Sequence, residues 1–427
     1  MIMDVVSVLL GISLILFLGF IAEFMFKKIN VPDLLVLIII GFLIGPYALN
    51  YVDPNQLSGF APLFTTFALL FLLYDGAFNI SLESLAKGAV KSLQITLINF
   101  VMSVLVITLI MLMFRFDILT SLLTGVILGG ISSAFTIPIL KQLNITGETY
   151  PILALESALT DVLCIVFAFT IMEIITLNTL NFQLVFSNIA SLFAVAGLIG
   201  ILAGVVWIIL IMKIFKDQKS YMITIAYLIL IYVLTEYLNG NGAIAALFFG
   251  LMLKNSKDIT TLFSKLLYKG DDKEKQKELR EKYVIDATSQ DEEFFYGQIS
   301  FFLKTFFFVY IGVLIKLSDI KALAIGAIMA VAVMLARRTN KYLTKRFSDF
   351  DQKAIMGIYA RGLAAAAIAQ VVANAGIPRA AEVVNIVYSM ILFSIIFSSA
   401  NIFIIKMYST KDKKDKKSQS ASQKAAT

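Results

Sequence analysis

The sequence predicts an all-α membrane protein that crosses the bilayer about thirteen times, and three observations support this fold class. The chain has 427 residues, of which 59% are hydrophobic and 15% charged, and its mean hydropathy is +0.87. A soluble domain carries about 25% charged residues. Apolar runs long enough to span a bilayer recur along the chain. Glycine, serine and proline interrupt two of these runs at matching positions in the two halves.

The apolar runs, delimited by charged residues and by Gly, Pro or Asn, give thirteen candidate spans. A helix needs about 20 mainly apolar residues to cross the hydrocarbon layer. The first run has no basic region or cleavage site before it, so we expect it to be a retained span. In chain order the spans cover residues 4–26, 31–50, 59–80, 88–114, 118–141, 149–177, 183–215, 219–238, 241–254, 294–316, 319–342, 352–375 and 382–407.

The basic residues in the connecting segments predict the orientation of these spans. One set of short loops carries Lys27, Lys28, Lys87, Lys91, Lys141, Lys213, Lys216, Lys219, Lys345, Arg346 and Lys353. The opposite loops carry only Arg115, Lys316, Lys321 and Arg379. The positive-inside rule places the Lys-rich side in the cytoplasm, so the N-terminus lies outside and the C-terminus inside. We expect a membrane domain over 1–410, a charged cytoplasmic loop at 255–293 and a short, basic, disordered tail at 411–427.

The two halves of the chain resemble each other at a shift of seven spans. The second span contains GFLIGP (41–46), and the ninth contains NGAIAALFFG (241–250). The fifth contains GGISSAFTIP (129–138), and the twelfth contains GIYARGLAAAA (357–367). Because seven is odd, the second copy enters the membrane in the opposite sense. Inverted repeats with interrupted helices are typical of secondary transporters, which place their ion sites at the breaks.

Composition excludes several kinds of chemistry. The chain has no histidine and one cysteine, Cys164, so it forms no internal disulfide and a Cys/His metal site is nearly excluded. Proton chemistry therefore falls to carboxylates or lysines. Lys304, near the start of the tenth span, is either inside the membrane or, as we expect, at its interface. The net charge of +7 comes mostly from loops and tail and does not indicate nucleic-acid binding. We expect no cofactor.

The sixth span contains two carboxylates in the sequence ESALTD. An ionised side chain at the bilayer centre costs about 3 kcal/mol or more, so it is a functional candidate. On a helix, Ser157 and Asp161 share one face, and Glu156 and Thr160 share a face about 100° away. The carboxylates therefore point in different directions, so one can hold a permanent ion pair while the other titrates. The alternative is that both only pack helices together.

Other charged residues fall inside or at the ends of apolar spans. Glu156 needs a cation, and we expect Arg337 in the eleventh span to supply it. The alternative is that Arg337 extends to the cytoplasmic interface, as we expect for Arg338. In the twelfth span, Arg361 is placed to neutralise the C-terminal ends of broken half-helices. Asp75, at the end of the third span, faces a cytoplasmic funnel or is an interfacial carboxylate.

The interrupted fifth span predicts a site at which the backbone serves an ion. Pro138 has no N–H and clashes with the carbonyl of Ala134. With the glycines before it, we expect the helix to unwind around 132–137. Freed carbonyls and the Thr136 hydroxyl would then be available to a hard cation. The alternative is a simple kink.

ESALTD and the interrupted fifth span resemble the cation–proton antiporters, most closely the branch of NhaP and the eukaryotic sodium/proton exchangers, over about residues 4–407. That family carries Glu-Ser, two residues and then Asn-Asp in its sixth span. The resemblance implies that Asp161 alternately binds cation and proton. It also implies that Ser157 and Thr160 are the coordinating and orienting neighbours of this carboxylate.

The same resemblance assigns the remaining charged residues. It pairs Glu156 with Arg337, and it places Arg361, followed by Gly362, in the second of two crossing helices. It matches Asp75 to the acidic residue that precedes glycine near the end of the third span.

The chain departs from the family pattern at two positions. Thr160 stands where the family has the Asn of Asn-Asp. The family's Thr-Asp-Pro in the first crossing helix reads Thr136-Ile137-Pro138, without the carboxylate. The segment SSAFTIPILKQL resembles the other branch of the family, which includes potassium-linked members.

The resemblance implies a sodium/proton antiporter fold and a multi-pass homodimer in the cell membrane. Spans 1–3 and 8–10 would form the dimer scaffold, spans 4–6 and 11–13 the moving core, and span 7 the connector. Transport would follow an elevator-type alternating access in which Na⁺ (or Li⁺) and H⁺ compete for Asp161. One carboxylate favours electroneutral exchange, in the service of pH homeostasis. The partners would be monovalent cations, protons and lipid.

Three alternatives to Na⁺/H⁺ exchange remain. The first is K⁺/H⁺ exchange on the same fold. The second is a membrane-embedded enzyme, which is disfavoured because the chain has no histidine and no acidic metal-binding loop; we expect no enzyme. The third is a passive cation channel.

Overall fold

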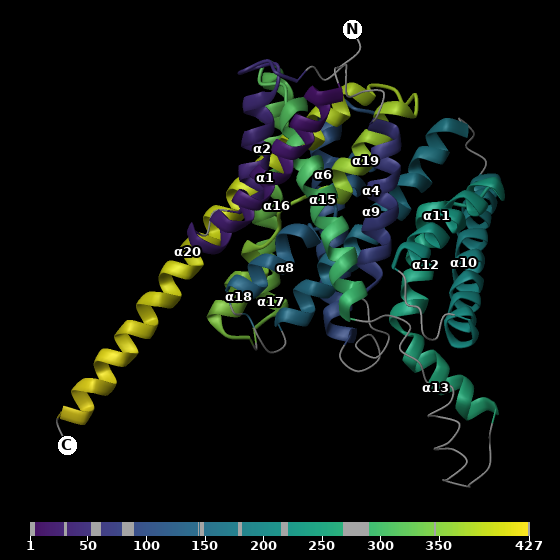
Figure 1. Ribbon diagram of the computed structural model, residues 1–427. Coiled ribbons are helices and arrows are strands. Elements are labelled where there is room, and N and C mark those ends of the chain that lie inside the picture. Colours follow the sequence, from purple (N-terminus) through teal and green to yellow (C-terminus); the bar gives the residue numbers. More distant parts are fainter. Residues whose placement is uncertain are drawn as a thin grey trace. The chain divides into compact units, whose positions relative to one another are not determined.

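The described part of the chain is helical throughout in the computed structural model, with no strand among the described residues (Figure 1). The structure describes residues 5–29, 32–52, 61–78, 89–143, 145, 149–177, 182–214, 221–267, 290–345 and 347–425. The helices are α1 (Val5–Ile29), α2 (Asp33–Ile44), α4 (Ala61–Ala77), α6 (Ala89–Met113), α7 (Ile118–Ile127), α8 (Ser133–Gln142), α9 (Thr149–Leu177), α10 (Phe182–Lys213), α11 (Tyr221–Tyr237), α12 (Gly242–Lys254), α13 (Ser256–Leu267), α15 (Gln290–Leu314), α16 (Ile320–Ala336), η1 (Arg337–Thr339), α17 (Asn340–Leu343), α18 (Asp349–Gly357), α19 (Leu363–Asn374) and α20 (Ala380–Ala425).

Apolar helices occur at every predicted span. Within the described ranges, six of them are long and apolar enough to cross a membrane: Ser92–Met113, Thr149–Thr176, Phe193–Ile211, Phe294–Leu314, Ile320–Leu343 and Ala380–Lys406. Shorter apolar helices cover Ser13–Phe26, Asp33–Ile44, Leu63–Ala77, Ile118–Ile127, Tyr221–Tyr237, Gly242–Lys254 and Leu363–Asn374. These helices coincide one by one with the predicted spans, which confirms the all-α polytopic fold class.

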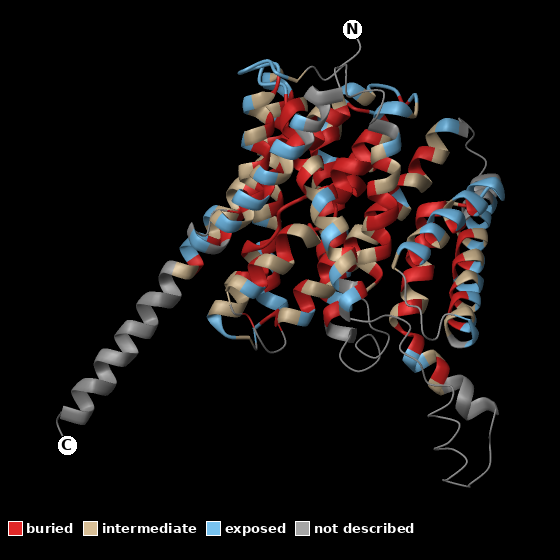
Figure 2. Cartoon of the chain, viewed as in Figure 1, coloured by how far each residue is buried: buried red, intermediate tan, exposed pale blue. Residues whose placement is uncertain are grey.

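The outer faces of the helices are as apolar as the inner ones. On α6, the large side chains of Val101, Leu105 and Leu109 are exposed, whereas Ile107 and Met111 are buried. The exposed residues recur every fourth position, which is one face of a helix. Figure 2 shows exposed residues along the outward sides of several helices and buried ones on their inward sides. Apolar surface of this extent on an outward face is what lipid, rather than water, would cover.

Contacts along the chain divide it into two compact units. The first contains Met1–Gly59, Lys91–Ala168 and Lys304–Thr427, and the second contains Phe60–Val90 and Phe169–Leu303. Boundaries between the units fall within α6, α9 and α15. The first unit holds both interrupted helices. These units are defined by contacts and differ from the predicted division into scaffold and core spans, which stays a prediction.

Two helices are interrupted, and their breaks contact each other in the first unit. Residues 128–132 separate α7 from α8, and residues 358–362 separate α18 from α19. The backbone N–H of Ser132 in one break donates to the carbonyl of Ala360 in the other, at 2.8 Å. The two interrupted helices therefore meet at their breaks, as the family resemblance implied.

The first break lies closer to the N-terminus than the predicted unwinding at 132–137. It covers 128–132, and α8 resumes at Ser133. A Cβ atom at Gly129 would lie 2.7 Å from the Phe100 ring, and one at Gly130 would lie 2.9 Å from the Cys164 sulfur. The glycines therefore allow the break to approach its neighbours. Pro138 lies in the second turn of α8, where its missing N–H removes one helical bond without ending the helix.

The C-terminal tail differs from its prediction. The segment 411–427 was expected to be disordered, but α20 continues as a helix to Ala425 (Figure 1). Lys, Gln and Ala are favourable helix formers, and the tail extends a helix that has already been nucleated. In the charged loop, residues 268–289 lie outside the described residues.

Helices α2 and α15 cross with their backbones in close approach. A Cβ atom on Gly41 would clash with the carbonyl oxygen of Val309, and one on Gly312 would clash with the carbonyl oxygen of Ile38. Small residues permit such approach between membrane helices, where packing replaces the hydrophobic effect as the driving force. The crossing therefore requires glycine on both helices.

A partly buried ion pair joins the same two helices. The Lys304 Nζ lies 2.7 Å from Asp33 Oδ2, and their side chains are 14% and 7% exposed. Lys304 is at the middle of the candidate span Phe294–Leu314. The carboxylate at the start of α2 provides the counter-charge that makes the partial burial of Lys304 possible. The location of Lys304 relative to the membrane interface stays a prediction.

We expect Lys304→Met to lower stability strongly, because it leaves Asp33 buried without its cation. Breaking one partner of a buried pair costs about 3–5 kcal/mol. The melting temperature of the purified protein in detergent measures this. Lys321→Met is the matched control, because the Lys321–Glu382 pair is exposed and such pairs contribute little. Equal melting temperatures for the two variants would contradict the prediction, and adding Asp33→Asn to Lys304→Met should recover part of the loss.

Candidate functional site

A second buried ion pair lies in the first unit, between Glu156 of α9 and Arg337 of η1. The Arg337 Nη1 lies 2.5 Å from Glu156 Oε1, and Nη2 lies 3.2 Å from Oε2. The two side chains are 2% and 1% exposed. Arg338, the next residue, is exposed. The structure thus places the guanidinium of Arg337 against the carboxylate, with two N–H groups facing two oxygens, which is the stronger pairing geometry.

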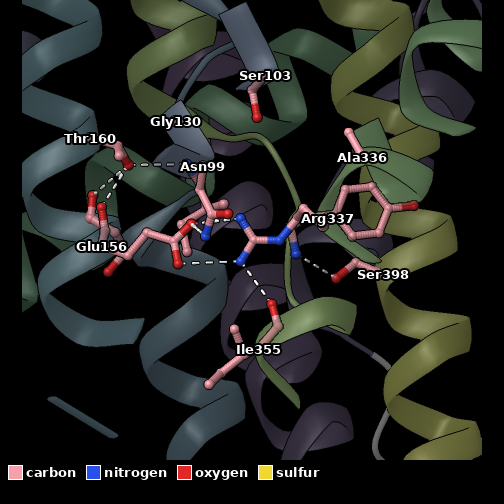
Figure 3. Close-up of polar contacts among 12 residues, drawn as sticks. Asn99, Ser103, Gly130, Glu156, Thr160, Ala336, Arg337, Ile355 and Ser398 are labelled. Atoms are coloured by element: carbon pink, nitrogen blue, oxygen red, sulfur yellow. Dashed lines mark hydrogen bonds and ion pairs between the residues drawn. The ribbon is translucent and has the colours of Figure 1, made fainter. Parts of the chain in front are cut away.

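Two further groups complete this charge network (Figure 3). The Asn99 amide of α6 donates to Glu156 Oε1 at 3.0 Å. The Arg337 Nη2 also donates to the carbonyl of Ile355 in α18, at 2.8 Å. Four elements are therefore joined through one carboxylate and one guanidinium. Sequence reasoning gave Asn99 no role, although a buried amide within an apolar span was the available signal.

Arg361 lies in the second break and is fully buried. Its Nη1 donates to the carbonyl of Gly130, and its Nη2 donates to the Ser103 hydroxyl at 3.0 Å. Its backbone N–H donates to the Ser394 hydroxyl at 2.9 Å. Gly130 follows the C-terminal end of α7, where the helix dipole is negative. The guanidinium is therefore positioned to compensate that end of the half-helix.

Side chains of α9 bind the backbone of the first break. The Thr160 hydroxyl accepts the N–H of Ile131 at 3.1 Å and donates to the carbonyl of Glu156 at 2.7 Å. The N–H of Gly130 points to the Cys164 sulfur at 3.2 Å. Amides that lost their helical partners are thus satisfied by side chains, as a buried backbone requires. The role of Cys164 was missed by sequence reasoning.

Asp161 has neutral surroundings. Its Oδ2 accepts a hydrogen bond from the Ser133 hydroxyl at 2.7 Å. Asp161 is partly exposed. Ser133 is the first residue of α8, so the carboxylate lies near a helix N-terminus, which favours negative charge. Asp161 has no ion pair with any described residue. Ser133 was not among the predicted site residues; the Ser-Ser pair at the start of the resumed helix was the signal.

The other predicted site residues are placed separately. Ser157 is buried and donates to the carbonyl of Ala154 at 3.0 Å within its own helix. Thr136 is buried, and its hydroxyl has no hydrogen-bond partner among the described residues. Asp75 lies in the second unit, where it accepts a hydrogen bond from Ser300 at 2.8 Å.

Glu156 and Asp161 of α9 therefore differ in how their charge is compensated. Glu156 is neutralised by a fixed guanidinium, whereas Asp161 has only a hydroxyl and a helix end beside it. A mobile cation or a proton can neutralise Asp161 without displacing a resident cation. Within the described part of the chain, no three acidic or cysteine side chains gather as metal ligands. A cation at Asp161 would therefore rely on one carboxylate with hydroxyl and backbone oxygens, which suits a hard ion.

Crossed, interrupted helices with charges compensated at their breaks define the class of secondary transporters. The family described as the transmembrane sodium/hydrogen exchanger matches residues 12–406. The chain belongs to this family, which makes it a multi-pass membrane transporter rather than an enzyme.

Named relatives and solved structures agree with this assignment. The chain is 29% identical over 232 residues to the probable Na⁺/H⁺ antiporter 2 of Methanocaldococcus jannaschii, covering 50% of the chain and 51% of that protein. It is 24% identical over 352 residues to Na⁺/H⁺ antiporter 1 of the same organism, covering 78% and 74%. The match thus spans about half the length of the first relative.

The structure of the sodium proton antiporter MjNhaP1 from Methanocaldococcus jannaschii at pH 8 has a similar fold, with a TM-score of 0.71. It shares 20% sequence identity, and the match covers 93% of this chain and 97% of that one. An electron-microscopy structure of the same antiporter gives a TM-score of 0.70 at 20% identity, covering 95% and 98%. The antiporter fold predicted from sequence is confirmed.

We expect Arg337→Met to destabilise the protein by about 3–5 kcal/mol, because it leaves the buried Glu156 carboxylate without a cation. Thermal unfolding in detergent, followed by tryptophan fluorescence or size-exclusion recovery, measures the loss. Arg338→Met removes the same charge from an exposed neighbour and should leave the melting temperature nearly unchanged. A stable Arg337→Met variant would contradict the importance given to the pair.

Proposed function

We propose that this protein exchanges Na⁺ for protons across the cell membrane and that Asp161 is the carboxylate for which the two ions compete. The observation that carries the proposal is the contrast on α9: Glu156 is held by Arg337, while Asp161 has only a neutral hydroxyl partner. The family and the antiporter names of the two relatives support the choice of ions.

Competition at one carboxylate couples the two fluxes. Asp161 releases its proton on the more alkaline side and takes up the cation. After the site faces the other side, a proton displaces the cation. Because one charge is exchanged for one charge, the proposed exchange is electroneutral, and Li⁺ is a second proposed substrate. In the proposal, Ser157, Thr160 and Thr136 supply or orient neutral oxygens around the cation, and no resident cofactor takes part.

The proposed conformational change is an elevator motion. Spans 4–6 and 11–13 would move as a core against a scaffold of spans 1–3 and 8–10, with Asp75 in a cytoplasmic funnel. The scaffold would also form a homodimer. The bias of basic residues towards one set of loops supports an outside N-terminus and a cytoplasmic C-terminus.

One observation favours K⁺/H⁺ exchange as the second candidate. The chain has Ile137 in α8 where the family carries an aspartate, so α8 contributes the hydroxyls of Ser133 and Thr136 rather than a second carboxylate. A site with one carboxylate has a weaker electrostatic field and compensates less for the dehydration of a small cation, which shifts preference towards a larger one.

We expect Asp161→Asn to abolish exchange, since an amide cannot bind or release the transported proton. In everted vesicles with a pH-sensitive dye, cation-induced dequenching should fall to the level of empty vesicles. Glu173→Gln makes the same chemical change on the same helix, beyond the site, and should retain exchange. Retained exchange in the Asp161→Asn variant, at equal protein level, would overturn the assignment.

Substituting the cation in the same vesicles separates the two candidates. We expect Na⁺ and Li⁺ to drive dequenching and K⁺ to drive little. An imposed membrane potential should leave the rate unchanged, because the proposed exchange carries no net charge. A response to K⁺ without one to Na⁺ would replace the first candidate with the second, and a rate that follows the potential would contradict electroneutrality.

A further inference from the structure

One face of α6 is polar, although the helix is otherwise a strongly apolar span. Four of its buried polar residues recur at intervals of three or four positions and therefore form a stripe along the helix. They are Ser92, Thr96, Asn99 and Ser103. A polar stripe inside a membrane protein needs partners, because neither lipid nor bulk water satisfies it.

Asn99 binds the more heavily compensated carboxylate of α9. Its Nδ2 donates to Glu156 Oε1 at 3.0 Å, and the same oxygen accepts Arg337 Nη1 at 2.5 Å. Asn99 is 4% exposed and Glu156 1%. The amide therefore fixes the position of the carboxylate from the side of α6 (Figure 3).

Ser103, one helical turn further along α6, binds the other buried cation. Its hydroxyl accepts Arg361 Nη2 at 3.0 Å, and Arg361 in turn donates to the Gly130 carbonyl in the first break. Two adjacent turns of one helix thus contact the Glu156–Arg337 pair and the crossing of the broken helices. The spacing of Asn99 and Ser103 sets the register between these two networks.

We propose that Asn99 is a positioning residue for transport, which holds Glu156 on Arg337 and so reserves Asp161 for the mobile cation and the proton. This inference rests on the proposed function. Arg337 has no second carboxylate partner among the described residues. A guanidinium released from Glu156 would become an internal competitor for Asp161, five residues further along the same helix. Asn99 acts through Glu156 and does not touch the transported ion.

The test exchanges the amide and the carboxylate between the two helices. Asn99→Asp adds a second carboxylate next to the Glu156–Arg337 pair, whereas Glu156→Gln leaves Arg337 without any carboxylate. Each single variant should therefore lower the exchange rate about ten-fold. The double variant, Asn99→Asp with Glu156→Gln, restores one carboxylate and one amide beside Arg337. We expect its exchange rate and melting temperature to recover most of the loss.

Thr96→Val is the matched control, because it removes a hydroxyl without a described hydrogen-bond partner from the same face of α6. It should leave both readouts unchanged. The proposal would be overturned if the double variant lost as much exchange rate and melting temperature as the two single variants together. A residue that only fills space gives such additive losses, because moving the charge to it restores nothing. If Asn99→Asp fails to fold, Asn99→Leu replaces it. Adding Asn99→Leu to Glu156→Gln should then lower the exchange rate no further than Glu156→Gln alone. A further drop in the exchange rate would overturn the proposal.

The experiment separates this inference from the proposed function. Absence of exchange in the unmodified protein would refute the proposed function. The melting temperatures of the same four proteins would still report whether Asn99 and Glu156 are coupled. Exchange by the unmodified protein with no coupling between the two positions would refute the role of Asn99 alone.

Discussion

The Glu156–Arg337 ion pair is the interaction on which the rest of the first unit depends. A charge inside a membrane protein persists only where an opposite charge or several donors compensate it. The carboxylate comes from α9, the guanidinium from η1, and their remaining hydrogen bonds go to Asn99 of α6 and Ile355 of α18. The cost of separating these groups fixes the relative positions of four elements. It also leaves Asp161, on the same helix five residues further along, without a resident cation.

The same rule of compensation applies to the backbone at the two breaks. An interrupted helix exposes amides and carbonyls that lipid cannot satisfy. Here Thr160 and Cys164 accept two amides of the first break, the carbonyl of Ala360 accepts a third, and Arg361 donates to the carbonyl of Gly130. The breaks are therefore specific structures held by neighbouring side chains. An elevator motion of spans 4–6 and 11–13, as proposed, would have to carry these contacts along intact.

Much of the architecture could be predicted from the sequence, because the bilayer imposes strict rules. From span length, apolar composition and the charged residues that delimit the spans, the sequence predicted helices that coincide with those observed. The matching interruptions were visible as Gly and Pro within apolar runs. The exact place of the first break was not visible. Pro138 suggested residues 132–137, but α8 accommodates the proline, and the contacts of Gly129 and Gly130 with α6 and α9 place the break at 128–132.

By itself, the sequence determined that the chain is a membrane protein built from repeated, interrupted helices and that Glu156 and Asp161 point to different faces of one helix. Local periodicity decides these features. Only the tertiary structure decided which partner each polar group found. The partners of Asn99, Ser133 and Lys304 were not predicted, since these partners lie far away in sequence. A polar residue in an apolar span indicates that a partner must exist. Which helix supplies that partner depends on how the helices pack.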